Sequence, residues 1–377
     1  MSTFVVRGDI LLGEGFTYGA LRIEAGRIAG IERLPTGAMR ESPRYEAAYI
    51  APGFVDLQVN GGFGAEVGED PEAIRTLAAR LPETGVTAFL PTVITSPAAF
   101  YPKAVAAFEA AKDAPGARLL GLHIEGPFLS PERPGAHRHD LIEHADPRLL
   151  GVLFASDAVR LVTLAPERPD APELIHRLKE RGILVSLGHT DATYEQFEAG
   201  VDAGARMATH LYNAMSPFGH RAPGAIGAAL LDDRITVGVI ADGVHSHPAS
   251  IALAFRIKHA LHTALVTDMM AAAGMPPGAY VLGGQAVIVD GASARLADGT
   301  LAGSLLTMDQ AVRNMMQWTD ATPVDALRMA SEVPARLMGQ GGCIAVGADA
   351  DLVLLDRDFR VQATIIKGDV VYERGAA

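Results

Sequence analysis

The sequence is short of cysteine, of positive charge and of long apolar runs. Cys343 is the single cysteine among 377 residues, which excludes an intramolecular disulfide and a cysteine-rich metal site and favours a reducing compartment. No apolar run approaches the roughly 20 residues of a membrane span, and the first residues resemble no secretory signal. We therefore expect a cytoplasmic protein that has no membrane partner.

Positive charge is scarce because 32 Lys and Arg residues stand against 44 Asp and Glu residues, which gives a formal net charge of -12. A nucleic-acid-binding surface needs clustered Lys and Arg, so we expect no nucleic-acid partner. A phosphate or carboxylate ligand would need a local group of donors that works against the overall field.

The two ends of the chain share a pattern of short strands and tight turns. Both ends lack a helical period and carry hairpin signals, Glu24-Ala25-Gly26 near the start and Lys367-Gly368-Asp369 near the end. We expect one small β domain made of residues 1–51 and 343–377, interrupted by a larger domain of residues 52–342.

The central region alternates strands with helices. Eight apolar runs read as buried strands, and several of the stretches between them begin with proline, as helices often do; the runs are 54–59, 86–90, 119–124, 159–164, 183–187, 206–209, 235–240 and 265–267. This pattern predicts an α/β fold, a (β/α)8 barrel. A doubly wound sheet is the alternative, but no G-x-G-x-x-G motif follows an early strand. A hairpin insertion is expected over 279–300, before a helix over 304–318.

Three residues of metal-ligating types follow three of these strands. Glu125 ends the third strand, and His189 and His210 follow the fifth and sixth. Any one of the 12 histidines is more often a satisfied structural residue, but three such residues at corresponding strand ends favour a three-ligand catalytic zinc site. The same set would suit ferrous iron.

An acidic residue follows the eighth strand. Asp268 ends the segment Leu265-Val266-Thr267-Asp268, on the barrel face that would also carry the metal. A carboxylate there can take a proton from water and return it to a leaving group, so Asp268 is the candidate general base and acid. The alternative interpretation is a cap for the next helix.

Six motifs together resemble the N-acetylglucosamine-6-phosphate deacetylases, a family of metal-dependent amidohydrolases. They are PGFVDLQVNG (52–61), GLHIEGPF (121–128), GHTDAT (188–193), THLYNAM (209–215), ADGVH (241–245) and LVTD (265–268). GADADLVLLD (347–356) resembles the closing segment of amidohydrolases in general. The resemblance implies a barrel with a small β-sandwich built from both termini.

The resemblance also implies roles for individual residues. Glu125, His189 and His210 would hold the metal, and Asp268 would be the catalytic acid and base. His137 would polarise the acetyl carbonyl and stabilise the developing oxyanion; without the resemblance it reads as a solvated loop histidine.

The substrate contacts are implied in the same way. The sugar phosphate would be bound by residues in four loops: Ala136 with His137, Asn213 with Ala214 and Arg221, His245, and Leu301, Ala302 and Gly303. The arginine would reach across the interface of a homodimer, and a guanidinium is well suited to phosphate.

The first strand departs from the usual amidohydrolase pattern. Most amidohydrolases have His-x-His there, whereas this chain has Gln58 and Asn60. Neutral amides are poor transition-metal ligands, so we expect one divalent metal ion per subunit, zinc in the first place.

The expected activity is hydrolysis of N-acetylglucosamine 6-phosphate to glucosamine 6-phosphate and acetate. Two alternatives stay open: a deacetylase of N-acetylgalactosamine 6-phosphate, which would share the catalytic residues, and a non-catalytic sugar-phosphate binding protein on the same scaffold.

Overall fold

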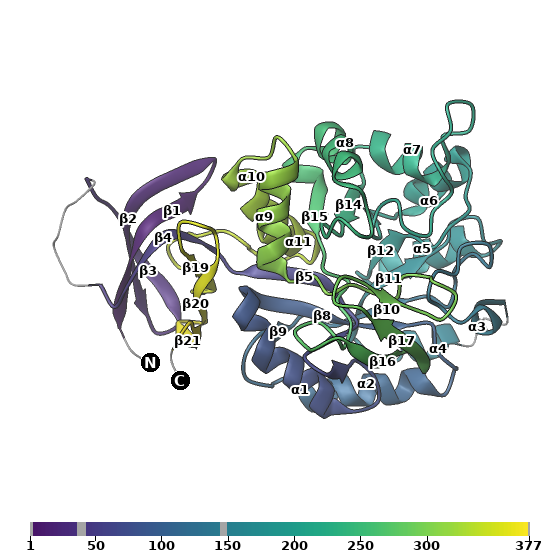
Figure 1. Ribbon diagram of the computed structural model, residues 1–377, viewed down its shortest axis with the longest axis horizontal. Helices are drawn as coiled ribbons and strands as arrows, with labels where there is room; N and C mark the ends of the chain where they lie inside the picture. Colours follow the sequence, from purple (N-terminus) through teal and green to yellow (C-terminus); the bar gives the residue numbers. More distant parts are fainter. Residues whose placement is uncertain (1–2, 36–42, 144–148, 376–377) are drawn as a thin grey trace.

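The computed structural model describes residues 3–35, 43–143 and 149–375. In Figure 1, a sheet formed by the first and last strands stands to one side of a larger body in which helices surround parallel strands. None of the helices in the described ranges is long and apolar enough to cross a membrane.

The smaller sheet joins the two ends of the chain. Its seven strands lie in the order β21-β20-β19-β4-β1-β2-β3, and β19 pairs antiparallel with β4, which makes the link. The strands are β1 (Phe4–Leu12), β2 (Gly15–Glu24), β3 (Arg27–Arg33), β4 (Tyr45–Pro52), β19 (Leu352–Leu355), β20 (Val361–Ile366) and β21 (Asp369–Glu373).

This sheet bends around its own apolar core. Val6, Leu21 and Ile365 are fully buried in that core, and a bridge between Arg27 and Asp349 brings β3 against the segment before β19. The expected β-sandwich formed from both ends is therefore confirmed. The division of the chain into domains at 51/52 and 342/343 stays a prediction.

The larger sheet is the predicted barrel. Its parallel strands follow chain order, and a short β9 (Arg118–Leu119) pairs beside β8; the others are β5 (Phe54–Val59), β8 (Val86–Ile94), β10 (Leu122–Glu125), β11 (Val159–Leu164), β12 (Leu184–Leu187), β13 (Met207–Ala208), β14 (Thr236–Val239) and β15 (Thr263–Leu265). The residues after β15 close the barrel, because Met269 bridges to Val59 and the Asp268 N–H donates to the Gln58 carbonyl at 2.9 Å.

Several strands differ from the expected ranges by one or more residues, and for two of them the physical reason is visible. The third expected strand is divided into β9 and β10, with Gly121 at φ +134° between them, a conformation that favours glycine. The eighth ends at Leu265 rather than Thr267, because the Thr267 N–H, like the Thr267 hydroxyl, donates to the side-chain carboxylate of Asp56 in β5 and not to a backbone carbonyl of that strand.

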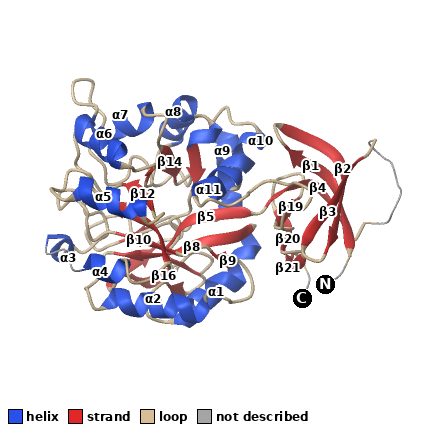
Figure 2. Cartoon of the chain, turned by 180° about the vertical axis from the view of Figure 1, so that it is seen from behind, coloured by secondary structure: helices blue, strands red, loops and turns tan. Residues whose placement is uncertain are grey.

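Helices cover the outside of the barrel (Figure 2). The principal ones are α1 (Pro71–Arg80), α2 (Phe100–Ala111), α5 (Ala171–Glu180), α6 (Tyr194–Ala203), α7 (Gly224–Leu231), α8 (Pro248–Lys258), α9 (Met308–Trp318), α10 (Pro323–Ala330) and α11 (Glu332–Leu337). α9 begins four residues later than the predicted 304, since Ser304 is held by backbone bonds between its N–H and the Asp268 carbonyl and between its carbonyl and the Met270 N–H.

The insertion after the eighth strand is a small three-stranded sheet of β16 (Gly278–Leu282), β17 (Gln285–Val289) and β18 (Ala294–Arg295). Its hairpin turn is anchored at two points: the Gly283 N–H donates to Glu66 at 2.6 Å, and the Gln285 amide donates to the Ala136 carbonyl at 2.6 Å. The insertion therefore lies beside the loops that follow the barrel strands.

Candidate active site

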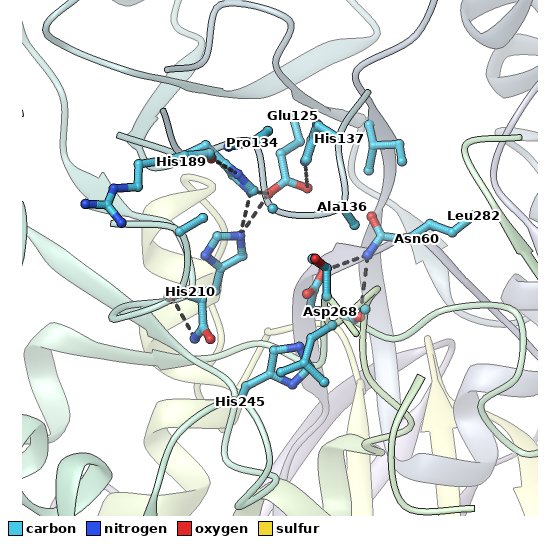
Figure 3. A pocket seen from close by; sticks show the side chains of 18 of the residues that line it. Asn60, Glu125, Pro134, Ala136, His137, His189, His210, His245, Asp268 and Leu282 are labelled. Atoms are coloured by element: carbon cyan, nitrogen blue, oxygen red, sulfur yellow. Dashed lines mark hydrogen bonds and ion pairs between the residues drawn. The ribbon is translucent and has the colours of Figure 1, made fainter. Parts of the chain in front are cut away.

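The polar residues singled out in the sequence meet at one edge of the barrel. Glu125 is the last residue of β10, His189 and His210 each come two residues after a strand, and Asp268 comes three residues after β15. Because the strands are parallel, their carboxyl ends share one face. All four line a cavity of about 480 Å³ (Figure 3).

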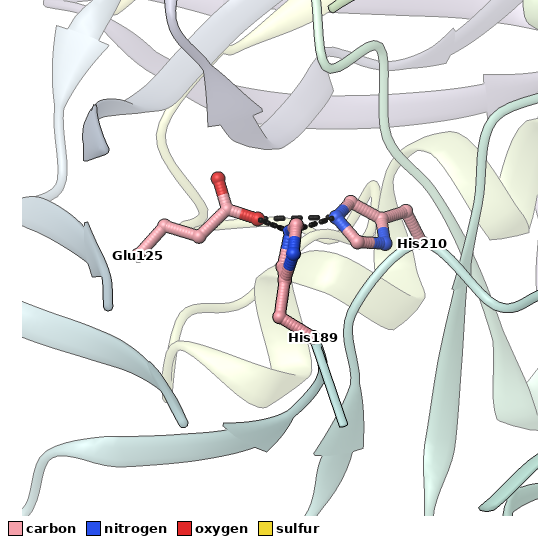
Figure 4. Close-up of side chains that lie close together, drawn as sticks. All are labelled: Glu125, His189 and His210. Atoms are coloured by element: carbon pink, nitrogen blue, oxygen red, sulfur yellow. Dashed lines mark hydrogen bonds and ion pairs between the residues drawn. The ribbon is translucent and has the colours of Figure 1, made fainter. Parts of the chain in front are cut away.

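Glu125, His189 and His210 converge on one point (Figure 4). Glu125 Oε1 lies 3.2 Å from His189 Nε2 and 3.1 Å from His210 Nε2, and the two nitrogens are 3.1 Å apart. All three residues are buried, and their candidate ligand atoms lie within 4.8 Å of one another. The predicted ligands are therefore brought together.

The hydrogen bonds around this group suit a cation. His189 Nδ1 lies 3.1 Å from the Arg133 carbonyl, so Nδ1 carries a proton, and Nε2, which faces Glu125 and His210, is the ring nitrogen available as a metal ligand. Burial alone would raise the pKa of Glu125, but the hydrogen bonds from His189 and His210 hold that pKa well below its usual range. Two imidazole nitrogens that converge on an ionised carboxylate fit a divalent metal ion, which would replace the protons on these nitrogens.

Of the four polar residues that meet at this edge, three have left-handed backbone: His189 at φ +48°, His210 at φ +28° and Asp268 at φ +51°. This conformation costs a non-glycine residue of order 1–3 kcal/mol and is found most often at functional sites. The sequence gives no signal for it. Backbone bonds hold two of the residues in place, from the Ser130 N–H to the His189 carbonyl and from the Ser304 N–H to the Asp268 carbonyl, both 2.8 Å.

The two amides of the first strand support the acidic residues. The Gln58 amide donates to Glu125 Oε1 at 3.1 Å, and the Asn60 amide donates to Asp268 Oδ1 at 2.6 Å. Both side chains are buried. Here they act as hydrogen-bond donors to the predicted metal ligand Glu125 and the predicted acid–base residue Asp268, a role that sequence reasoning did not identify.

Asp268 has the environment of a general base. Burial, and after it the charge of Glu125, raise the pKa of Asp268 to about 6, which is close to the range in which a carboxylate can both accept and return a proton. The helix-cap alternative finds no support, because the side chain is bonded to Asn60 and the N-cap of α9 is Thr307.

His137 presents a proton to the cavity. Its Nδ1 accepts from the Thr95 N–H at 3.2 Å and lies 2.8 Å from the Thr95 hydroxyl, so the proton of the neutral ring is on Nε2. Burial, followed by the charge of His189, lowers the pKa of His137 to about 3. His137 is 7% exposed, which contradicts the solvated-loop interpretation.

Most of the expected substrate residues surround the same cavity: Ala136, Asn213, Ala214, His245, Leu301 and Gly303. His245 is oriented by Asp242, whose Oδ2 lies 2.7 Å from His245 Nδ1. Ala302 is fully buried behind these lining residues.

Arg221 is exposed and does not line the cavity of its own chain. Sequence reasoning missed Ile94 and Leu282, which also line it.

A parallel barrel with two histidines and a glutamate beside a buried aspartate defines a metal-dependent hydrolase. The Amidohydrolase family model matches residues 49–371. The chain therefore belongs to the amidohydrolase family, in its group of N-acetyl hexosamine 6-phosphate deacetylases.

Curated relatives are similar over nearly the whole chain. The N-acetylglucosamine-6-phosphate deacetylase of Bacillus subtilis (strain 168) is 40% identical over 367 residues, covering 94% of this chain and 93% of the relative. The Homo sapiens enzyme of that name is 40% identical, covering 99% and 95%. An N-acetylgalactosamine-6-phosphate deacetylase of Escherichia coli O157:H7 is 39% identical, covering 93% and 94%.

Solved structures of deacetylases are similar to this chain over nearly its whole length. A mutant N-acetyl-D-glucosamine-6-phosphate deacetylase from Mycobacterium smegmatis in complex with N-acetyl-D-glucosamine-6-phosphate has a TM-score of 0.92 at 35% identity, covering 98% of this chain and all of that one. The Pasteurella multocida enzyme has a TM-score of 0.91 at 33% identity, covering 98% and 99%.

Proposed function

We propose that this protein hydrolyses N-acetylglucosamine 6-phosphate to glucosamine 6-phosphate and acetate, in the catabolism or recycling of amino sugars. The observation that carries the proposal is the buried group of Glu125, His189 and His210 beside Asp268 in one cavity. The chain has about 40% identity to curated enzymes of this activity over nearly its whole length.

One divalent ion per subunit, zinc in the first place with ferrous iron as the alternative, would be held by Glu125, His189 and His210. When bound, such an ion supplies a Lewis acid and lowers the pKa of water. Gln58 and Asn60 are already used as donors to Glu125 and Asp268, which supports a single ion rather than two.

The chain's own residues perform the proton transfers. Asp268 accepts a proton as water attacks the acetyl carbon and forms the new C–O bond. His137 keeps its proton and donates a hydrogen bond from Nε2–H to the carbonyl oxygen, where negative charge develops. Asp268 then gives its proton to the sugar nitrogen as the C–N bond breaks, which yields acetic acid and the free amine; transfer of the acid's proton to the amine gives acetate and the ammonium form of the sugar.

Replacement of the acid–base residue tests this assignment. We expect Asp268→Asn to lower kcat by roughly 10²- to 10⁴-fold, the usual contribution of general acid–base catalysis, while the variant keeps its metal. Acetate release measured together with metal content checks both. Near-normal turnover of the metal-loaded variant would contradict the role of Asp268, and two tightly held ions per subunit would contradict a single-metal site.

Phosphate recognition is assigned to Asn213, Ala214, His245 and Arg221. Arg221 lies outside its own cavity, so we propose that it reaches the site of a second subunit in a homodimer. Exposed apolar side chains flank the Arg221 loop, with Phe218 60% and Leu231 63% exposed, which supports an interface there.

A charge-assisted hydrogen bond contributes about 1.5–3 kcal/mol, or roughly ten- to a hundredfold in affinity. Arg221→Ala should weaken the binding of N-acetylglucosamine 6-phosphate by that factor, seen as a rise in KM. The KM for unphosphorylated N-acetylglucosamine should stay nearly unchanged. Arg256→Ala, which removes an exposed arginine of α8 paired with Asp320, serves as the control. An equal loss of affinity for both sugars would contradict a role of Arg221 in phosphate binding.

A second candidate substrate is N-acetylgalactosamine 6-phosphate, because a relative named for that activity is 39% identical. Turnover on the two epimers distinguishes the candidates. Acetate release from either one excludes a non-catalytic binding protein.

A cytoplasmic location is our further proposal, supported by the single cysteine, Cys343.

A further inference from the structure

A second cavity adjoins the active site. It has a volume of about 420 Å³ and shares Asn60, Ile94 and Leu282 with the catalytic cavity. We propose that Ile94 and Leu282 form a wall that limits the length of the N-acyl group, and that the cavity behind this wall is a latent subsite for longer, uncharged acyl chains. The inference rests on the proposed deacetylase function and specifies its substrate range.

The acyl group must point toward this wall. In the proposed reaction the carbonyl oxygen faces His137 and Glu125, the departing nitrogen lies within reach of Asp268, and the sugar extends toward His245. The remaining substituent of the carbonyl carbon is the methyl group. Figure 3 shows Ala136, Asn60 and Leu282 on the side of His137 and Asp268 that is opposite His189 and His210, where this methyl group would lie.

The wall is closed by direct packing. Ile94 ends β8 and is 9% exposed, while Leu282 ends β16 and is 3% exposed. Both belong to one apolar cluster, which also contains Val287. A Cβ placed on Gly283 would meet the Ile94 side chain at 2.7 Å, so the hairpin turn packs against Ile94 without a gap.

The second cavity suits an alkyl chain. Its lining is mixed, with apolar residues that include Val67, Val93, Phe100 and Val281. Its charged members are the acidic Glu66, Glu69 and Asp70 and one basic residue, Arg138, which is paired with Asp140. Methylene groups gain free energy by burial against such apolar surface, while the carboxylates disfavour acyl chains that end in a negative charge. Unbranched propanoyl to hexanoyl groups are the matching class.

The test compares kcat/KM for N-acetyl-, N-propanoyl-, N-butanoyl- and N-hexanoylglucosamine 6-phosphate with the metal-loaded enzyme. One misplaced methylene in a fitted apolar pocket changes kcat/KM by roughly tenfold or more, so the wild type should lose activity stepwise along this series. Leu282→Ala and Ile94→Ala should each raise the butanoyl-to-acetyl ratio at least tenfold. Val287→Ala removes packing from the same cluster but lines neither cavity, and should leave the ratio unchanged.

Binding gives a second readout that does not depend on turnover. In an Asp268→Asn background, calorimetry should show that Leu282→Ala strengthens binding of the N-butanoyl sugar phosphate relative to the N-acetyl one. The inference is overturned if the wild type hydrolyses N-butanoyl and N-acetyl substrates equally well, or if folded Leu282→Ala and Ile94→Ala both keep the wild-type ratio. Absence of acetate release from the N-acetyl substrate by the wild type would instead overturn the proposed function.

Discussion

Two donors on one residue determine which nitrogen of His137 faces the cavity, where the proposed reaction places the substrate carbonyl. Thr95 directs both its backbone N–H and its hydroxyl at Nδ1, which leaves the Nε2 proton for the substrate. Thr95 is therefore a positioning residue that acts through His137. In the sequence it is one of several threonines in an apolar run, and nothing marks it as different from the others.

Removing the hydroxyl tests this role. Thr95→Val keeps the backbone N–H and loses one hydrogen bond, which contributes about 0.5–1.5 kcal/mol, so kcat should fall about two- to tenfold while KM changes little. Thr95→Ser, which restores the hydroxyl, should recover the wild-type kcat. A fall in thermal stability with unchanged kcat would show that Thr95 serves packing alone.

Residues at strand ends could be predicted from the sequence, and residues that reach the site from elsewhere could not. Glu125, His189 and His210 each follow an apolar run, so the barrel pattern alone places them on one face. His137 follows no strand and was indicated only by the resemblance. Leu282 comes from the hairpin insertion, whose position over the cavity depends on contacts with Ala136 and Glu66 that leave no pattern in the sequence.

Among the structural elements, the loop between β12 and α6 carries His189 and is held by Glu167. The two Glu167 oxygens accept from the Thr190 hydroxyl at 2.5 Å and from the Asp191 N–H at 2.7 Å. Arg133, whose carbonyl orients His189, also pairs with Asp191 at 2.8 Å. This set of bonds maintains the loop in the conformation that points His189 at Glu125.

Loss of the Glu167 carboxylate should therefore weaken metal binding. Glu167→Ala is expected to lower metal affinity by about tenfold or more, as changes to partners that orient metal ligands commonly do, in a competition titration with a chelator. Asp325→Ala is the matched control, because Asp325 also accepts from a threonine hydroxyl and a backbone N–H, both of Thr322, away from the site. Equal metal affinity in the two variants would contradict the role of Glu167.

For the whole molecule, the sequence predicted both the barrel and the small β domain of the two ends, but not how the barrel closes. Alternating apolar runs and helices are strong signals, and the β pattern at both ends explains why those ends share a sheet. The closure depends on Asp56, a buried carboxylate that accepts from the Thr267 hydroxyl at 2.5 Å and from the Thr267 and Gln58 N–H groups at 3.2 Å each. In the sequence, this aspartate is only a charged residue within an apolar strand.

The pH dependence of stability tests the role of Asp56. Burial raises the pKa of Asp56 from its ordinary 3.8 to about 7, although the hydrogen bonds from Thr267 and Gln58 lower it. The folded state thus binds this proton more tightly than the unfolded state. The resulting stability is fully present below about pH 4 and is lost as the pH rises toward 7, by on the order of 3–4 kcal/mol.

Asp56→Asn carries no such proton, so the difference in unfolding free energy between wild type and variant should shift in favour of the variant between pH 4 and 8. Urea unfolding in the presence of a chelator measures this shift without the pH dependence of metal binding. Asp349→Asn, which changes an exposed aspartate that is paired with Arg27, should follow the wild type at every pH. Parallel wild-type and Asp56→Asn curves would show that Asp56 stays ionised in the folded barrel, and that its hydrogen bonds to the first and last strands outweigh the cost of its burial.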